Sequence, residues 1–155
     1  MKEKTIKALY VEPGKTPRMI EMPNTLEAKQ KAVGGWIEAT YPFDDNVAVI
    51  CNEEGKLNGM EYNRMLKDEK GKIYDVIAGP FLIVGADPDD EDFGSLPADL
   101  AKKYKQRFKN PEFYERDPET GRMHVTIMEI QDMPDTPKFG SKLPSQSDLN
   151  KGFRR

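Results

Sequence analysis

Residues 36–52 read Trp36-Ile37-Glu38-Ala39-Thr40-Tyr41-Pro42-Phe43, then Asp44-Asp45-Asn46, then Val47-Ala48-Val49-Ile50-Cys51-Asn52. The first and third pieces are rich in β-branched and aromatic residues, which fit a pleated sheet. The polar tripeptide between them is typical of a turn. This stretch therefore predicts two strands joined by a short turn, and the fold is built outward from that pair.

The chain before this pair predicts a hairpin and a helix. Residues 6–11 and 17–22 have strand composition, and Pro13-Gly14-Lys15-Thr16 separates them. Asn24 is predicted to cap a following helix, with Glu27 reaching back in a capping box. Gly34 and Gly35 supply the permissive backbone that ends this helix.

The chain after the pair predicts a broken apolar segment, a second helix and one late strand. Residues 73–85 are mostly apolar, and Gly79-Pro80 divides them into two pieces that change direction. Ser95 is predicted to cap a helix with Pro97 in its first turn. One face of that helix is expected to join the core through residues spaced by four: Leu96, Leu100, Tyr104 and Phe108. The late strand is expected around Val125 and Ile127.

These elements follow one another without regular β-α-β alternation, which favours an α+β fold: a mostly antiparallel sheet with one or two helices packed on one face. We expect a single domain over residues 1–133. From residue 134 to residue 155 the composition is rich in Pro, Ser, Gly, Asp and Lys, which predicts a disordered tail.

Charge and composition exclude several functional classes. With 24 basic and 27 acidic residues the net charge is only −3, so nucleic-acid binding is not expected. The single cysteine, Cys51, is predicted to be a buried, reduced thiol. No signal sequence or membrane-length apolar run is present, so we expect a cytoplasmic protein that does not bind membranes. The sequence predicts neither a cofactor nor a metal site, because His124 is its only histidine and the acidic run 87–92 lacks calcium-loop spacing.

Polar side chains are dense between residues 38 and 64, and two interpretations are open. Asn52, Gly55 and Asn58 can serve the geometry of a turn. Alternatively, polar residues of this segment converge on one exposed surface that binds a polar ligand or a partner's backbone, with Arg64 available for a bidentate contact to phosphate or carboxylate. The candidate residues are Glu38, Asn52, Glu54, Asn58, Asn63 and Arg64.

Several ordered motifs resemble an uncharacterised domain family. They are Val33-Gly34-Gly35-Trp36-Ile37-Glu38, Asn52-Glu53-Glu54-Gly55-Lys56-Leu57-Asn58-Gly59, Asn63-Arg64 and Ile77-Ala78-Gly79. The resemblance covers residues 6–86, with residues 87–133 as an extension. The family is a domain of unknown function found in bacteria, their phages and conjugative elements. This resemblance implies a mobile-element accessory protein and transfers no activity.

The chain has no phosphate-binding glycine loop and no recognisable catalytic set, so we expect no enzyme. Two functions stay open. The first is a non-enzymatic phage or mobile-element protein that binds a host protein, such as one serving defence or replication. The second is a binder of a small polar ligand or a nucleotide. The sequence does not determine the oligomeric state.

Overall fold

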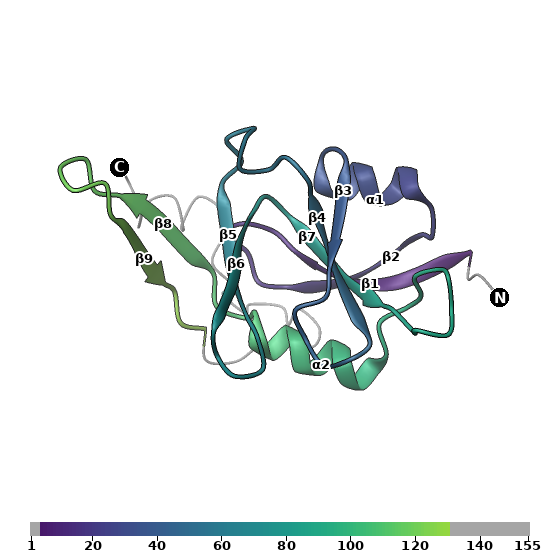
Figure 1. The fold of residues 1–155 in the computed structure, drawn as a ribbon. Helices are drawn as coiled ribbons and strands as arrows, with labels where there is room; N and C mark the ends of the chain where they lie inside the picture. Colours follow the sequence, from purple (N-terminus) through teal and green to yellow (C-terminus); the bar gives the residue numbers. More distant parts are fainter. Residues whose placement is uncertain (1–3, 131–155) are drawn as a thin grey trace, which may run out of the picture.

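The computed structural model describes residues 4–130, and its centre is a five-stranded antiparallel sheet (Figure 1). The strand order across this sheet is β2-β1-β7-β4-β3. Its strands are β1 (Thr5–Val11), β2 (Arg18–Pro23), β3 (Ile37–Thr40), β4 (Val47–Asn52) and β7 (Phe81–Gly85). The predicted hairpin of β1 and β2 and the predicted pair of β3 and β4 are both confirmed.

The sheet is covered on both faces, which explains why its inner strands are apolar without alternation. Every residue of β4 and of β7 is buried. Alternate residues enter two separate clusters: Val49 and Ile83 belong to one, and Ile50 and Leu82 to the other. A strand that is buried on both sides has no face in contact with solvent, so its sequence does not alternate apolar and polar residues.

The first helix, α1 (Leu26–Val33), packs on β3, β4 and β7. It ends at Gly34, whose φ of 81° is left-handed, as the sequence predicted. The predicted cap at Asn24 is wrong, because Thr25 is the N-cap and its side chain accepts from the amide of Ala28. The buried Asn24 side chain instead donates to the Phe93 carbonyl at 2.8 Å.

The opposite face of the sheet carries α2 (Ala98–Arg107) and a two-stranded hairpin of β5 (Tyr62–Lys67) and β6 (Ile73–Ala78). Leu66 and Ile77 anchor the hairpin in the same cluster as Tyr104 and Phe108 of the helical segment. The predicted direction change near Gly79-Pro80 is confirmed, since β6 and β7 belong to different sheets.

The predicted start of α2 needs a correction. Pro97, not Ser95, is its N-cap, and no side chain caps it. The Ser95 hydroxyl instead accepts from the amide of Lys7 at 3.0 Å, which ties the segment before α2 to β1. The predicted core face of the helix is confirmed, with Leu96, Tyr104 and Phe108 buried and Leu100 packed against them.

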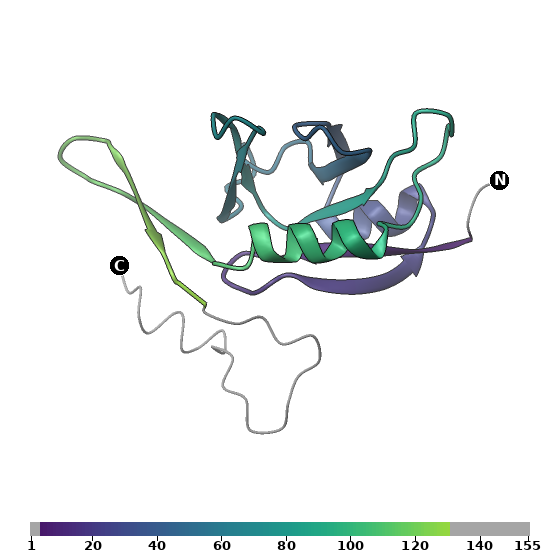
Figure 2. The ribbon, with the colours of Figure 1, turned by 90° about the horizontal axis from the view of Figure 1, so that it is seen from below.

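A further hairpin, β8 (Glu112–Arg116) and β9 (Met123–Ile127), extends away from the body of the molecule (Figures 1 and 2). The sequence predicted β9 and missed β8. Glu112 fixes the base of the hairpin, because its Oε1 accepts from the amide of Met65 at 2.9 Å and from the Tyr114 hydroxyl at 2.6 Å.

The α+β class and the mostly antiparallel sheets are confirmed. The helices, however, do not share a face: α1 contributes to one core cluster and α2 to the other. Within residues 4–130, no helix has the length and hydrophobicity needed to cross a bilayer. The predicted disordered tail at residues 134–155 lies outside the described residues.

Candidate binding surface

Asn63 and Arg64 do not lie on an exposed surface, which corrects the expectation that they join a surface patch. Each is 0% exposed. The Asn63 amide donates to the carbonyls of Val11 and Gly79, both at 2.9 Å, and so joins β5 to the central sheet. Arg64 cannot make the expected bidentate contact with a ligand, because protein encloses its side chain on all sides.

Arg64 instead holds three segments of the chain together. Its Nε donates to the Phe108 carbonyl at 3.1 Å, and its Nη2 donates to the Lys15 carbonyl at 2.7 Å. Its Nη1 donates to Asn63 Oδ1 at 2.8 Å. Burial lowers the pKa of the guanidinium to about 10, and the negative charge of Glu112 acts in the opposite direction. The geometry fits a structural clamp.

Asn52 is also engaged in local structure. Its Oδ1 accepts from the amide of Glu54 at 2.8 Å, and its Nδ2 donates to the Val33 carbonyl at 3.1 Å. Gly55 follows in the same turn, where a Cβ atom would lie 2.5 Å from the Ala78 carbonyl oxygen. The turn interpretation therefore accounts for Asn52 and Gly55. Glu54 and Asn58 are exposed on the turn that follows β4.

Two of the predicted residues, Glu38 and Asn52, line one cavity, but their side chains lie on opposite faces of the sheet, because Glu38 pairs with Cys51 and Asn52 pairs with Ile37. Glu38 and Asn52 line a cavity of about 270 Å³ between β3, the turn after β4, and β6. Glu53, Lys56, Leu57 and Asp75 line the same cavity. Lys56 Nζ lies 2.6 Å from Asp75 Oδ1, so Glu38 and Glu53 leave an excess of negative charge there.

Cys51 opens into this cavity with its thiol 4.0 Å from Glu38 Oε1. Burial raises the pKa of the thiol to about 11, and the negative charge of Glu38 raises it further. Cys51 is 8% exposed, so the predicted buried, free thiol is confirmed. A thiol with a raised pKa is a poor nucleophile at neutral pH.

Large apolar side chains lie exposed beside the cavity. Leu57, which lines it, is 84% exposed, and Trp36, the residue before β3, is 65% exposed. The Trp36 carbonyl accepts from the amide of Glu53, another lining residue, at 2.8 Å. Side chains alternate along a strand, so Trp36 is on the same face of β3 as Glu38. We call this region, comprising Trp36, β3, Glu53 and Leu57, the β3 surface.

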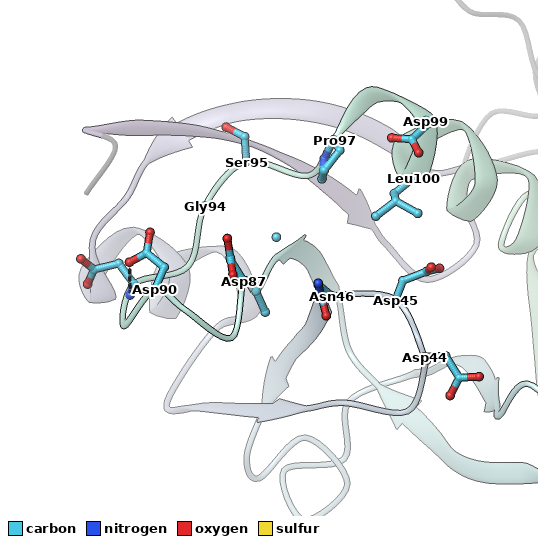
Figure 3. A pocket seen from close by; sticks show the side chains of 13 residues that line it. Asp44, Asp45, Asn46, Asp87, Asp90, Gly94, Ser95, Pro97, Asp99 and Leu100 are labelled. Carbon is cyan, nitrogen blue, oxygen red and sulfur yellow. Dashed lines mark hydrogen bonds between the residues drawn. The ribbon is translucent and has the colours of Figure 1, made fainter. Parts of the chain in front are cut away.

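A second hollow has an acidic lining and a volume of about 630 Å³. Figure 3 shows its side chains coming from the turn after β3 (Asp44, Asp45, Asn46), the loop after β7 (Asp87, Asp90) and α2 (Asp99). Asp87 and Asp90 accept from loop amides two residues ahead, and Asp45 accepts from Lys103 and Tyr104 at 2.6 Å. These contacts stabilise the loops, and no cluster suited to a metal ion occurs among residues 4–130.

A third hollow, of about 400 Å³, lies where the projecting hairpin meets β5 and β6. Tyr62 and Tyr114 face each other there with ring centroids 5.4 Å apart. The lining is otherwise made by apolar Ile73, Val76 and Met123 and by the charged pair Lys56 and Asp75. Tyr114 and Met123 belong to the hairpin. This hollow therefore depends on a segment whose first strand the sequence did not predict.

Comparison with known families matches residues 6–109 to a domain of unknown function, DUF3846. The chain belongs to the DUF3846 family. The match is longer than the predicted residues 6–86, because it takes in α2, which closes one face of the core. The hairpin of β8 and β9 follows the end of the matched DUF3846 segment. No curated protein and no solved structure matches the chain.

The β3 surface also contains residues that the sequence did not single out as partners of Glu38. Glu53 and Leu57 belong to the Asn52–Gly59 motif, but the sequence does not give the shape of that turn and so does not place them beside β3. Trp36 follows Gly34 and Gly35 and directly precedes the four-residue strand β3. A tryptophan between a glycine turn and such a short strand has little core to enter, and this position is the signal for its exposure.

Proposed function

We propose that this DUF3846 protein is a non-enzymatic accessory protein of a phage or mobile element that binds a host protein through the β3 surface. The observation that carries the proposal is the exposure of Trp36 and Leu57 beside the cavity that Glu38 and Asn52 line. Tryptophan in such a position is typical of the residues that dominate binding energy at protein interfaces.

The chemistry of the surface supports a protein partner over a small anionic ligand. A nucleotide needs donors for its phosphates, and Arg64, the predicted donor, uses its guanidinium on main-chain and amide oxygens. The cavity beside β3 has carboxylates in excess of its single lysine, which would repel a phosphate. Its volume of about 270 Å³ lies just below the usual range for ligand pockets.

The test is affinity capture from bacterial lysate followed by measurement with the purified partner. Wild-type protein and the Trp36→Ala and Leu57→Ala variants are immobilised, captured proteins are identified by mass spectrometry, and the dissociation constant of each candidate is measured by calorimetry. We expect Trp36→Ala to weaken binding by about 30-fold, which corresponds to roughly 2 kcal/mol for a central aromatic residue.

The matched control is Ile127→Ala, because Ile127 is 53% exposed and lies on the projecting hairpin. It should bind as the wild type does, and all three variants should melt at the wild-type temperature. Failure to capture any protein at micromolar concentration, or equal binding by Trp36→Ala and wild type, would overturn the proposal.

A further inference from the structure

The outer edge of β3 presents main-chain groups that make no hydrogen bond within residues 4–130. β3 pairs antiparallel with β4, and the Trp36 carbonyl accepts from the Glu53 amide, so this is a hydrogen-bonded pair. Such pairs alternate along an antiparallel ladder. Glu38 and Thr40 therefore bond to β4, whereas the N–H and C=O groups of Ile37 and Ala39 point away from it.

The opposite edge of the sheet gives a useful contrast. The amide of Asn24 donates to the Lys4 carbonyl, and the same alternation turns the main-chain groups of Met19 and Glu21 outward on β2. That strand ends in Pro23, and proline and charged side chains are devices that protect sheet edges from pairing. β3 has no proline over Ile37–Thr40 and no bulge in its register with β4, and Glu38 is its single charged residue.

We propose that an extended peptide segment of the protein partner adds to β3 as a sixth strand of the sheet, with a basic residue opposite Glu38. This inference rests on the proposed function and specifies how the β3 surface recognises its partner. Strand addition satisfies the outward groups of Ile37 and Ala39 with main-chain hydrogen bonds, and the side chains around the edge then select the sequence.

The charge around the edge defines the peptide. Because Ile37 and Ala39 bond outward, Glu38 falls in the non-hydrogen-bonded type of pair with an antiparallel added strand, where facing Cα atoms are about 4.5 Å apart. Glu38 and Glu53 make this face acidic, so a lysine or arginine fits opposite Glu38. On the other face, Ile37 and Ala39 pack against the apolar cluster under α1, which favours apolar residues beside the basic one.

The exposed ring of Trp36 extends this pattern by one repeat. It shares a face with Glu38, so a second basic residue two positions along the peptide would lie near the ring and gain a cation–π contact. The expected ligand is an extended segment in which basic and apolar residues alternate.

The decisive variant is Ala39→Pro, which removes an outward N–H and leaves the hydrogen bonds to β4 in place. Glu21→Pro is the matched control, because it removes an outward N–H from the edge strand on the far side of the sheet. Peptides are selected on the wild-type protein from a random dodecapeptide display library, synthesised, and titrated against both variants by fluorescence anisotropy. Thermal melts establish that each variant is folded.

We expect selected peptides to alternate lysine or arginine with apolar residues, and Ala39→Pro to weaken their binding at least tenfold while Glu21→Pro changes it less than twofold. Glu38→Lys, whose side chain is exposed, should weaken binding similarly and independently of any effect of proline on folding. Only every second amide of an added peptide strand faces β3. N-methylation of those amides should abolish binding, and N-methylation of the amides between them should leave binding unchanged.

Selection of no peptide, selection of peptides without basic residues, or equal binding by wild type and Ala39→Pro would each overturn strand addition. The proposed function is judged separately by host-protein capture. A captured host protein that binds Ala39→Pro as tightly as wild type leaves the proposed function standing and removes strand addition. If peptides with alternating basic residues bind through the β3 edge but no host protein is captured, strand addition stands and the proposed function is removed.

Discussion

Replacing Arg64 should destabilise the fold severely, because its side chain is 0% exposed and joins three separate segments. Arg64→Ala leaves the buried carbonyl of Phe108 without a donor, at about 1–3 kcal/mol, removes the part-buried hydrogen bond to the Lys15 carbonyl, and opens a large cavity. Together these terms predict a loss of about 4 kcal/mol in the free energy of unfolding. With a denaturant slope of about 2 kcal/mol per molar, the urea midpoint should fall by about 2 M.

Equilibrium urea unfolding followed by circular dichroism measures this loss, and Arg64→Met separates its two parts. Methionine refills part of the cavity but supplies no donor, so its loss should be about 2–3 kcal/mol. Arg18→Ala is the control: Arg18 pairs with Glu12 at 3.3 Å with its side chain 61% exposed, and its loss should stay within about 0.5 kcal/mol. If Arg64→Ala shifts the midpoint no more than Arg18→Ala, the clamp is refuted.

Three further predictions concern single side chains. Cys51, whose pKa is raised from 9.0 to about 11, should react with a disulfide reagent at pH 8 about 100-fold more slowly in the native protein than in urea; equal rates would contradict its burial. Asp45 has a lowered pKa because it accepts hydrogen bonds from Lys103 and Tyr104, so its contribution is present above pH 3.8 and is lost as pH falls through the folded-state value. Asp45→Asn should therefore cost about 1 kcal/mol at pH 7, with the difference from wild type closing in acid, and a gap that persists in acid would exclude the ionic contribution. Gly55→Ala should cost more than about 2 kcal/mol, measured by thermal melting, because its Cβ would meet the Ala78 carbonyl at 2.5 Å; an unchanged melting temperature would show that the turn can shift.

The strands of the central sheet could be predicted from the sequence because their buried positions are occupied by apolar residues. The run from Val47 to Cys51 is apolar throughout, and it is covered on both faces. The two layers that cover the sheet could not be separated in the same way. A helix stripe such as Leu96, Tyr104 and Phe108 shows that the helix packs on something, but it contains no information about which face of the sheet that is.

The errors at polar residues have one physical cause. Residue type predicts that Asn63 and Arg64 lie on the surface, because charged and amide groups are usually exposed, yet both are fully buried with main-chain carbonyls as partners. Those carbonyls belong to residues far away along the chain, so local spacing cannot reveal them. Strand β5 was missed for a different reason: Asn63 and Arg64 are consecutive buried polar residues at a shift in the register with β6, so the alternation that a strand normally shows is absent.

The clamp formed by Arg64 has an architectural consequence. It fixes the carbonyl of Phe108, one residue before the matched DUF3846 segment ends at residue 109, so the matched segment is closed before β8 begins. The projecting hairpin lies outside the matched segment and is joined at its root through Glu112 and the ring of Tyr114. Removing the hairpin would therefore leave every hydrogen bond of the Arg64 guanidinium in place.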